Sequence, residues 1–256
     1  MYTTDPTQLS LIALAIGAVF LLGGLVKGVI GLGLPTIVMG LLSLSMPPAQ
    51  AAALLVVPSL LTNVWQIAAR PGWLQMARRL LPMQLALCMG IAAGSGWLTS
   101  APAVWATAGL GLALSIYAVL GLLSVAWVVS DRAGRLWAMP VGLCTGLVTA
   151  ATGVFVIPAV PYLQALGLDK EELVQALGLS FLVSTIALGL SLLYGGALNL
   201  EMGLASLLAL VPAIAGMAIG QGLRQRLSPA AFKRVFLWGL LTLGVYLCSR
   251  SLVSTF

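Results

Sequence analysis

One lysine lies where a positive charge is costly. Lys27 is the only charged residue between Pro6 and Ala69, a stretch dominated by apolar side chains. An ionisable group inside a membrane span costs roughly 2.5 to 3.5 kcal/mol on insertion scales, so it normally faces a cavity or a partner. No Asp or Glu lies deep in any apolar stretch to pair with it. An unpaired lysine in such a stretch could bind an anionic ligand. The alternative is that Lys27 lies near an interface and extends its ammonium group into water.

The residues that follow Lys27 interrupt a regular helix. Gly31 and Gly33 come just before Pro35, and Thr36 follows. Glycine lets the backbone approach a ligand closely, and proline suits the first turn of a new helix. A helix that begins inside a membrane presents unpaired N–H groups and a partial positive charge, which attract an anion. These four residues are therefore candidate ligand contacts; the alternative is that they only pack or kink a membrane helix.

A second break of this kind is predicted in the stretch ATGVFVIP, residues 151–158. Thr149 and Thr152 would add hydroxyl donors there, and Gly153 would allow close approach of the backbone. Further candidates are the polar residues Asn63 and Gln66, in the apolar segment after the first break, and Ser180, in the corresponding segment after the second. Isolated serines and threonines in membranes more often bond their own helix or a neighbour.

The elements that position these residues must be membrane helices. Hydrophobic residues make up 61% of the chain and charged residues 7%, against about 25% in a soluble domain, and the mean hydropathy is +1.10. Several charge-free runs reach the length of about 20 residues that a helix needs to cross a bilayer. The alternating pattern of barrel strands is absent. The sequence predicts an all-α polytopic membrane protein.

Several classes of chemistry lack their usual residues. The chain has no histidine, and its three cysteines, Cys88, Cys144 and Cys248, form no CxxC pair. No Walker or Rossmann motif is present, so we expect no metal, no cofactor and no catalytic residue. The net charge of +6 is spread over short loops, which fits membrane orientation rather than nucleic acid binding.

Basic residues set the expected topology. They concentrate in three places: Arg70, Arg78 and Arg79; Arg132 and Arg135; and Arg224, Arg226, Lys233 and Arg234. The positive-inside rule favours the cytoplasm for all three. If every apolar segment crosses the membrane once, the three basic groups cannot all lie in the cytoplasm. They can if each broken segment enters and leaves the membrane on the same side. The main rival is a bundle of eight full crossings with one basic loop outside, since residues 9–29 could span unaided.

The hairpin hypothesis divides the chain into two halves. Residues 1–130 would hold a hairpin over 9–46 and spans over 51–69, 80–99 and 103–129. Residues 131–256 would hold a hairpin over 138–167 and spans over 173–196, 200–222 and 233–253. An odd number of crossings makes the halves inverted-topology repeats, an arrangement in which transporters bind ligand between the repeats near the midplane. Tyr2 and Phe256 would then both lie outside the cytoplasm.

The two breaks can also be aligned with each other. GLVKGVIGLGLPTIVMG, from Gly24, aligns with GLCTGLVTAATGVFVIP, from Gly142. Lys27 aligns with Thr145, so the repeat does not itself require a charge. The identical pairs are Gly24 with Gly142, Leu25 with Leu143, Gly28 with Gly146, and Val38 with Val156.

The paired glycine-rich breaks, each preceded by GxxxG, in two halves joined by a short basic loop, resemble the TauE/SafE family of sulfite exporters. The resemblance covers nearly the whole chain, although GLGLP and TGVFVIP contain fewer glycines than the usual family pattern. It implies a multi-pass protein of a cell membrane, the bacterial inner membrane, that transports small sulfur-containing anions such as sulfite or sulfoacetate without ATP-binding parts. Cys144, in the second motif, then becomes a candidate contact for a sulfur compound, with packing as the commoner role of a thiol.

Other functions stay open beside anion transport. They are import of a neutral or thiol-type sulfur compound and a non-transporting membrane scaffold, and a homodimer is compatible with each. The membrane potential favours outward movement of an anion by about 2.3 kcal/mol per unit charge per 100 mV, so uncoupled export is the direction we expect.

Overall fold

Helices are the only regular secondary structure in the part of the chain that the computed structural model describes, residues 6–68, 71–123 and 128–253. The helices are α1 (Pro6–Ile30), α2 (Leu34–Leu42), α3 (Pro48–Ala68), α4 (Trp73–Ala93), α5 (Trp97–Ser100), α6 (Ala103–Leu122), α7 (Asp131–Thr152), α8 (Ala159–Ala165), α9 (Lys170–Tyr194), α10 (Leu200–Leu223) and α11 (Pro229–Val253). Among the described residues, seven helices are long and apolar enough to cross a membrane: α1, α3, α4, α6, α9, α10 and α11. The protein is therefore a multi-pass membrane protein, as the sequence predicts.

The first predicted break is present between α1 and α2. Gly31 and Gly33 separate the two helices with φ angles of 80° and 117°, values that favour glycine. The helix α2 then turns back along α1, because a Cβ atom at Gly23 would lie 3.0 Å from the side chain of Leu34 and 3.3 Å from that of Val38. Together α1 and α2 form a helical hairpin.

The second predicted break is also present. The helix α7 ends at Thr152, Gly153 follows with a φ angle of 73°, and α8 begins at Ala159. The hydroxyl of Tyr162, on α8, donates to the carbonyl oxygen of Gly134, near the start of α7, at 2.8 Å. This contact brings α8 back along α7, so the second broken segment is a hairpin too.

Two helices begin about seven residues before the membrane segments predicted within them. The span predicted over 80–99 and the hairpin predicted over 138–167 leave out the arginines that precede them, whereas α4 begins at Trp73 and α7 at Asp131. Arginine has high helix propensity, so a membrane helix continues through its basic end into the interface. Ser130 caps α7 by accepting a hydrogen bond from the Ala133 N–H at 3.4 Å.

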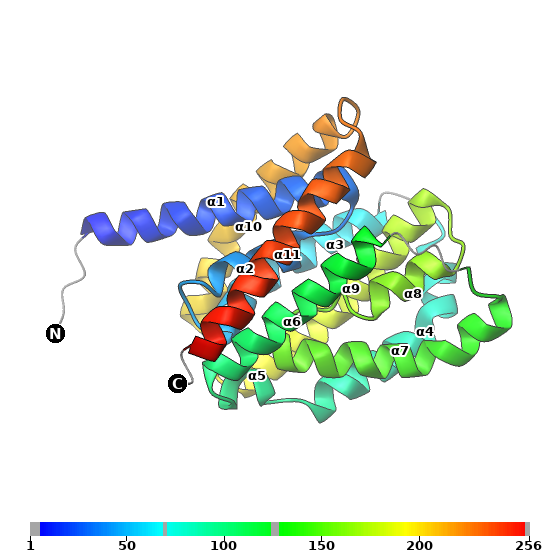
Figure 1. Ribbon diagram of the computed structural model, residues 1–256, viewed down its shortest axis with the longest axis horizontal. Helices are drawn as coiled ribbons and strands as arrows, with labels where there is room; N and C mark the ends of the chain where they lie inside the picture. The colour runs from blue at the N-terminus through cyan, green and yellow to red at the C-terminus, as the bar shows by residue number, and fades with distance from the viewer. Residues whose placement is uncertain (1–5, 69–70, 124–127, 254–256) are drawn as a thin grey trace.

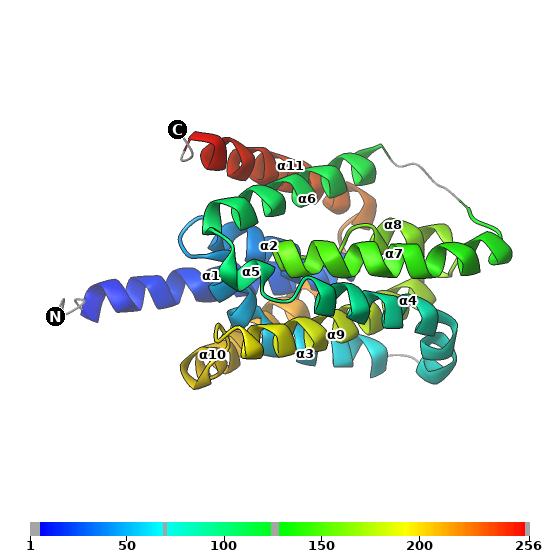
Figure 2. The ribbon, with the colours of Figure 1, turned by 90° about the horizontal axis from the view of Figure 1, so that it is seen from below.

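Each hairpin lies beside a helix from the other half of the chain. Figures 1 and 2 show α1 beside α10 and α4 beside α7. The pair α1 and α10 runs in one direction, because Gly24 meets Ala213 and Gly28 meets Met217. The pair α4 and α7 is likewise parallel, because Gly142 meets Met83 and Gly146 meets Leu87.

The remaining long helices form two antiparallel pairs. Along α3 and α9, Val56 lies near Gly189 while Gln66 lies near Gly178. Along α6 and α11, the thiol of Cys248 donates to the carbonyl oxygen of Ala108 at 3.6 Å. Gly121 of α6 meets Leu237 near the start of α11, so this pair is also antiparallel. Figure 2 shows α6 and α11 together along one edge of the bundle.

In each parallel pair the two helices approach so closely that the contact positions require glycine. A Cβ atom at Gly28 would lie 2.3 Å from the carbonyl oxygen of Met217, and one at Gly146 would lie 2.2 Å from that of Leu87. From the facing helices, Gly220 and Gly90 would make the same clashes with Leu25 and Leu143 oxygens. The GxxxG stretches that align in the sequence thus make equivalent close contacts, which we call the α1/α10 seam and the α4/α7 seam.

The basic groups gather toward one end of the bundle. The starts of α4 and α7 and the α10–α11 loop lie there, away from the start of α1 and the end of α11 (Figure 1). Arg70, Tyr2 and Phe256, to which the topology prediction also refers, lie outside the described residues. Many large apolar side chains on the outer surface are exposed, as a lipid-facing surface requires.

Candidate functional site

Lys27 is buried in the middle of the helix bundle. Its side chain is 1% exposed, and its Nζ atom donates hydrogen bonds to Thr62 Oγ1 at 2.9 Å and to Asn63 Oδ1, both on α3. The described acidic residues lie at the first turns of α7, α9 and α10 or just before them, far from this position along the chain. The ammonium group is thus held by neutral acceptors rather than extended to an interface.

The partners of Lys27 belong to a polar stripe on α3. Ser59, Thr62, Asn63 and Gln66 recur at helical spacing and are all buried. Asn63 Nδ2 donates to Ser59 Oγ at 3.2 Å, and Ser59 Oγ shares a hydrogen bond of 2.9 Å with Thr185 Oγ1 on α9. We call Lys27, Ser59, Thr62, Asn63 and Thr185 the Lys27 network; it joins α1, α3 and α9.

A proline explains how α3 is held beside this network. Pro58 lacks an N–H group, so the carbonyl oxygen of Leu54 loses its usual helical partner. Ser206 of α10 replaces that partner, because its hydroxyl donates to Leu54 O at 2.7 Å and accepts from the Val57 N–H at 3.0 Å. The part of α3 around Pro58 is therefore hydrogen-bonded to α10.

Gln66 connects the first break, at Gly31, to α3. Its Nε2 atom donates to the carbonyl oxygen of Gly31 at 2.6 Å, which satisfies a backbone group left free where α1 ends. Its Oε1 atom is buried and has no hydrogen-bond partner among the described residues. The structure thus joins Lys27 to Asn63 and Gly31 to Gln66 by hydrogen bonds, and all four are predicted site residues.

The predicted threonines bond within their own helix regions. Thr36 donates to Gly33 O at 2.9 Å, where Pro35 occupies the first turn of α2 as expected. Thr149 donates to the Thr145 carbonyl and Thr152 to the Val148 carbonyl, each at 2.7 Å. These hydroxyls shape the breaks and are already satisfied locally.

The two breaks do not meet at one point. Gly31 lies against Gln66, whereas a Cβ atom at Gly153 would lie 2.6 Å from Met39 of α2 and 3.5 Å from Ala52 of α3. Ala52 and Gln66 are separated by roughly 20 Å along α3, given the 1.5 Å rise per residue. The Lys27 network lies between these two levels, so Lys27 rather than a junction of the breaks occupies the middle of the bundle.

Two predicted residues lie elsewhere. Ser180 is buried on α9 and accepts a hydrogen bond of 2.8 Å from Gln84 Nε2 of α4, outside the Lys27 network. Cys144 is exposed on α7, so the structure does not bring its thiol to the other candidates.

Comparison with known families agrees with this architecture. Residues 16–247 match the sequence model of the family described as Sulfite exporter TauE/SafE. The chain belongs to this family. No curated protein and no solved structure matches it. The matched region of this TauE/SafE protein runs from α1 into α11, so it includes the Lys27 network and both hairpins.

Some polar residues of this TauE/SafE protein were not predicted. Ser59 and Thr62 complete the stripe of α3, and their spacing from Asn63 and Gln66 is a signal that the sequence does contain. Gln84 and Ser206 carry no such signal, because each stands apart from the other polar residues of its own helix and has its partner on another helix.

Proposed function

We propose that this protein is a secondary transporter of small sulfur-containing anions, such as sulfite, sulfoacetate or related organosulfur compounds, and that the anion binds at Lys27. The observation that carries the proposal is a buried ammonium group held by neutral partners only. An ammonium group has three N–H donors, and Thr62 and Asn63 accept two of them. A bound anion would accept a hydrogen bond from the third N–H and would neutralise the charge of the ammonium group. Transport would leave the covalent bonds of the anion unchanged.

The proposal includes two inverted repeats, residues 1–130 and 131–256. The parallel seams support it: α1 packs on α10 as α7 packs on α4, with glycines at equivalent positions. The antiparallel pairs α3/α9 and α6/α11 also fit, because a two-fold axis in the membrane plane reverses the direction of each equivalent helix. The Lys27 network joins α3 to α9 and would lie between the repeats.

The charge of the ligand favours export. An anion that leaves a cell with a negative interior gains about 2.3 kcal/mol per unit charge per 100 mV. Import would require a coupled cation, and no carboxylate of the described residues lies in the middle of the bundle to bind one. Backbone carbonyls at the two breaks are the alternative ligands for a sodium ion.

A thermal-shift panel tests the proposed binding. Purified protein in detergent is heated with sulfite, sulfoacetate, other sulfonates, thiosulfate and neutral thiols. A true ligand at 100 times its Kd stabilises the folded state by about 2.7 kcal/mol, which a rise in Tm reports. We expect that rise with one or more of the anions, a smaller rise in Lys27→Met, and the full rise in Lys233→Met, which removes a lysine near the start of α11.

A neutral or thiol-type sulfur compound is the second candidate. Gln66 Oε1 is a buried acceptor without a partner in the described residues, so an S–H or O–H donor could occupy it. Stabilisation by neutral thiols in both wild type and Lys27→Met, with none by anions, would favour this candidate and reject the anion site. No stabilisation by any compound would favour a scaffold.

A further inference from the structure

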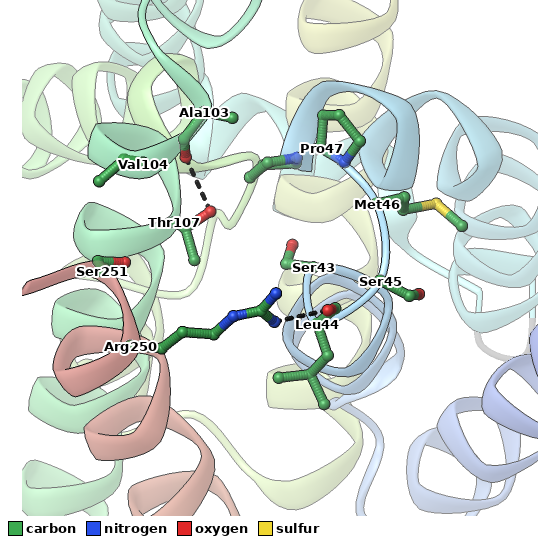
Figure 3. Close-up of a pocket in the computed structure, with 11 residues that line it drawn as sticks. Ser43, Leu44, Ser45, Met46, Pro47, Ala103, Val104, Thr107, Arg250 and Ser251 are labelled. Carbon is green, nitrogen blue, oxygen red and sulfur yellow. Dashed lines mark hydrogen bonds between the residues drawn. The ribbon is translucent and has the colours of Figure 1, made fainter. Parts of the chain in front are cut away.

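A polar cavity opens at the end of the bundle opposite the three basic groups named above. It has a volume of about 310 Å³ and lies between the α2–α3 loop, the first turns of α3 and α6, and the last turn of α11. Its polar lining residues include Ser43, Thr107 and Arg250 (Figure 3). None of the residues that line it is acidic.

Arg250 supplies the charge of this cavity. Its guanidinium group reaches from α11 toward the α2–α3 loop and donates to the carbonyl oxygen of Leu44 at 2.6 Å (Figure 3). A guanidinium group has five N–H donors, so this single bond leaves donors for a ligand. Because the positive-inside rule accounts for the basic groups at the other end of the bundle, it gives no reason for an arginine here.

Ser43 gives a second and independent indication of a ligand. Its side chain is 7% exposed, and its Oγ atom has no hydrogen-bond partner among the described residues. In Figure 3 the hydroxyl points into the space between Arg250 and Thr107. A buried hydroxyl without a partner is unfavourable, so a bound group that accepts its hydrogen bond would stabilise the site.

The first turns of two helices complete the positive surroundings. The helix α3 begins at Pro48 and α6 at Ala103, and both residues line the cavity. The partial positive charge at a helix start attracts anions, although α3 offers few free N–H groups, because Pro48 has none and the Gln50 N–H donates to the Pro47 carbonyl at 3.0 Å. The arginine, the unpaired hydroxyl and the helix starts thus favour the same ligand class.

We infer that this cavity, which we call the Arg250 site, binds a small oxyanion at the face opposite the basic loops. That this oxyanion is sulfite or a related sulfur anion rests on the proposed function. Arg250 and the Ser43 hydroxyl are its direct contacts. If the proposed transport function holds, the site lies at one mouth of the pathway and captures or releases the anion there. Binding at the Arg250 site does not itself depend on Lys27.

Titration calorimetry on the purified full chain in detergent tests the inference, with sulfite as the probe. The Lys27→Met variant provides the background, because it removes the deeper candidate site. In that background we expect sulfite to bind, Arg250→Met to abolish binding, and Ser43→Ala to weaken it about tenfold or more, the usual effect of losing a hydrogen bond to a charged group. Ser45→Ala is the matched control, because Ser45 lines the same cavity but already donates to Leu42 O at 3.2 Å.

Three outcomes would overturn the inference. Unchanged sulfite binding in both Arg250→Met and Ser43→Ala would show that the cavity is not the site. A lower Tm in Arg250→Met with an unchanged Kd would mean that Arg250 only fastens the end of α2. Binding of phosphatidylglycerol in place of sulfite would assign the cavity to a lipid headgroup. Failure of the Lys27 proposal looks different: sulfite binding to wild type would then depend on Arg250 and not on Lys27.

Discussion

At the scale of single residues, Lys27 is the feature that most restricts the function. Its burial removes water from the ammonium group, and Thr62 and Asn63 replace only part of that solvation. A buried charge held by neutral dipoles is costly to keep unless an anion occupies the site during function. The sequence predicts this residue and Asn63 because a charge and an amide stand out in apolar segments.

The contact between Lys27 and Asn63 gives a prediction about stability. Asn63→Leu leaves the ammonium group with one acceptor fewer, and we expect it to lower the unfolding free energy by about 1 to 3 kcal/mol. Lys27→Met should rescue much of that loss in the double variant, since replacing both partners by apolar groups can be nearly neutral. Unfolding of the four proteins in detergent gives the coupling energy. Strictly additive effects would show that the two side chains do not interact.

At the scale of elements, the glycines divide into two roles. Gly31, Gly33 and Gly153 allow the left-handed backbone of the breaks. Gly28 and Gly146 allow two helix backbones to approach so closely that a Cβ atom at either position would clash with the facing backbone. The sequence alignment of the two halves pairs Gly28 with Gly146, and the structure explains that identity by packing in the seams.

Glycine-to-alanine substitutions, which add one methyl group, test the close packing of the two seams. Gly28→Ala and Gly146→Ala each place a Cβ atom against a backbone carbonyl, and overpacking of this kind typically costs about 1 to 3 kcal/mol. We expect a lower Tm for both variants. Gly17→Ala is the control, because a Cβ atom at this position of α1 has no neighbour within 4 Å. Equal Tm values for the three variants would contradict the close packing.

The breaks show how far sequence reasoning extends at this scale. Glycine and proline mark where α1 and α7 end, and both ends lie in the predicted stretches. Their depth in the bundle depends on which residues of α3 each break contacts, Gln66 for one and Ala52 for the other. Such long-range packing has no local signal, so the separation of the breaks could not be predicted. Partners such as Ser206 are hidden for the same reason.

At the scale of the whole molecule, charge orients the protein. The basic starts of α4 and α7 and the α10–α11 loop lie toward one end, which the positive-inside rule places in the cytoplasm. The start of α1 and the end of α11 lie toward the other end, which fits the predicted location of both termini. The many exposed apolar side chains fit contact with lipid, and a homodimer stays a prediction.

Cysteine labelling tests this orientation. Cys88, Cys144 and Cys248 are first replaced by serine, and a single cysteine is then introduced as Ser45→Cys in the α2–α3 loop or as Ser228→Cys in the α10–α11 loop. A membrane-impermeant maleimide applied to intact cells should label the first variant and leave the second unlabelled until the cells are opened. Labelling of Ser228→Cys in intact cells would mean that the bundle has the opposite orientation.

Efflux from proteoliposomes tests the central claim most directly, that this chain moves a small sulfur anion by way of Lys27. Vesicles are loaded with radiolabelled sulfite, and potassium with valinomycin imposes an interior-negative potential. We predict that the potential speeds efflux through the wild-type protein, that Lys27→Met reduces efflux at least about tenfold, the cost of losing a charged hydrogen bond, and that Lys233→Met has wild-type efflux. An efflux rate that does not change with the potential and is equal in wild type and Lys27→Met would contradict transport of the anion by way of Lys27.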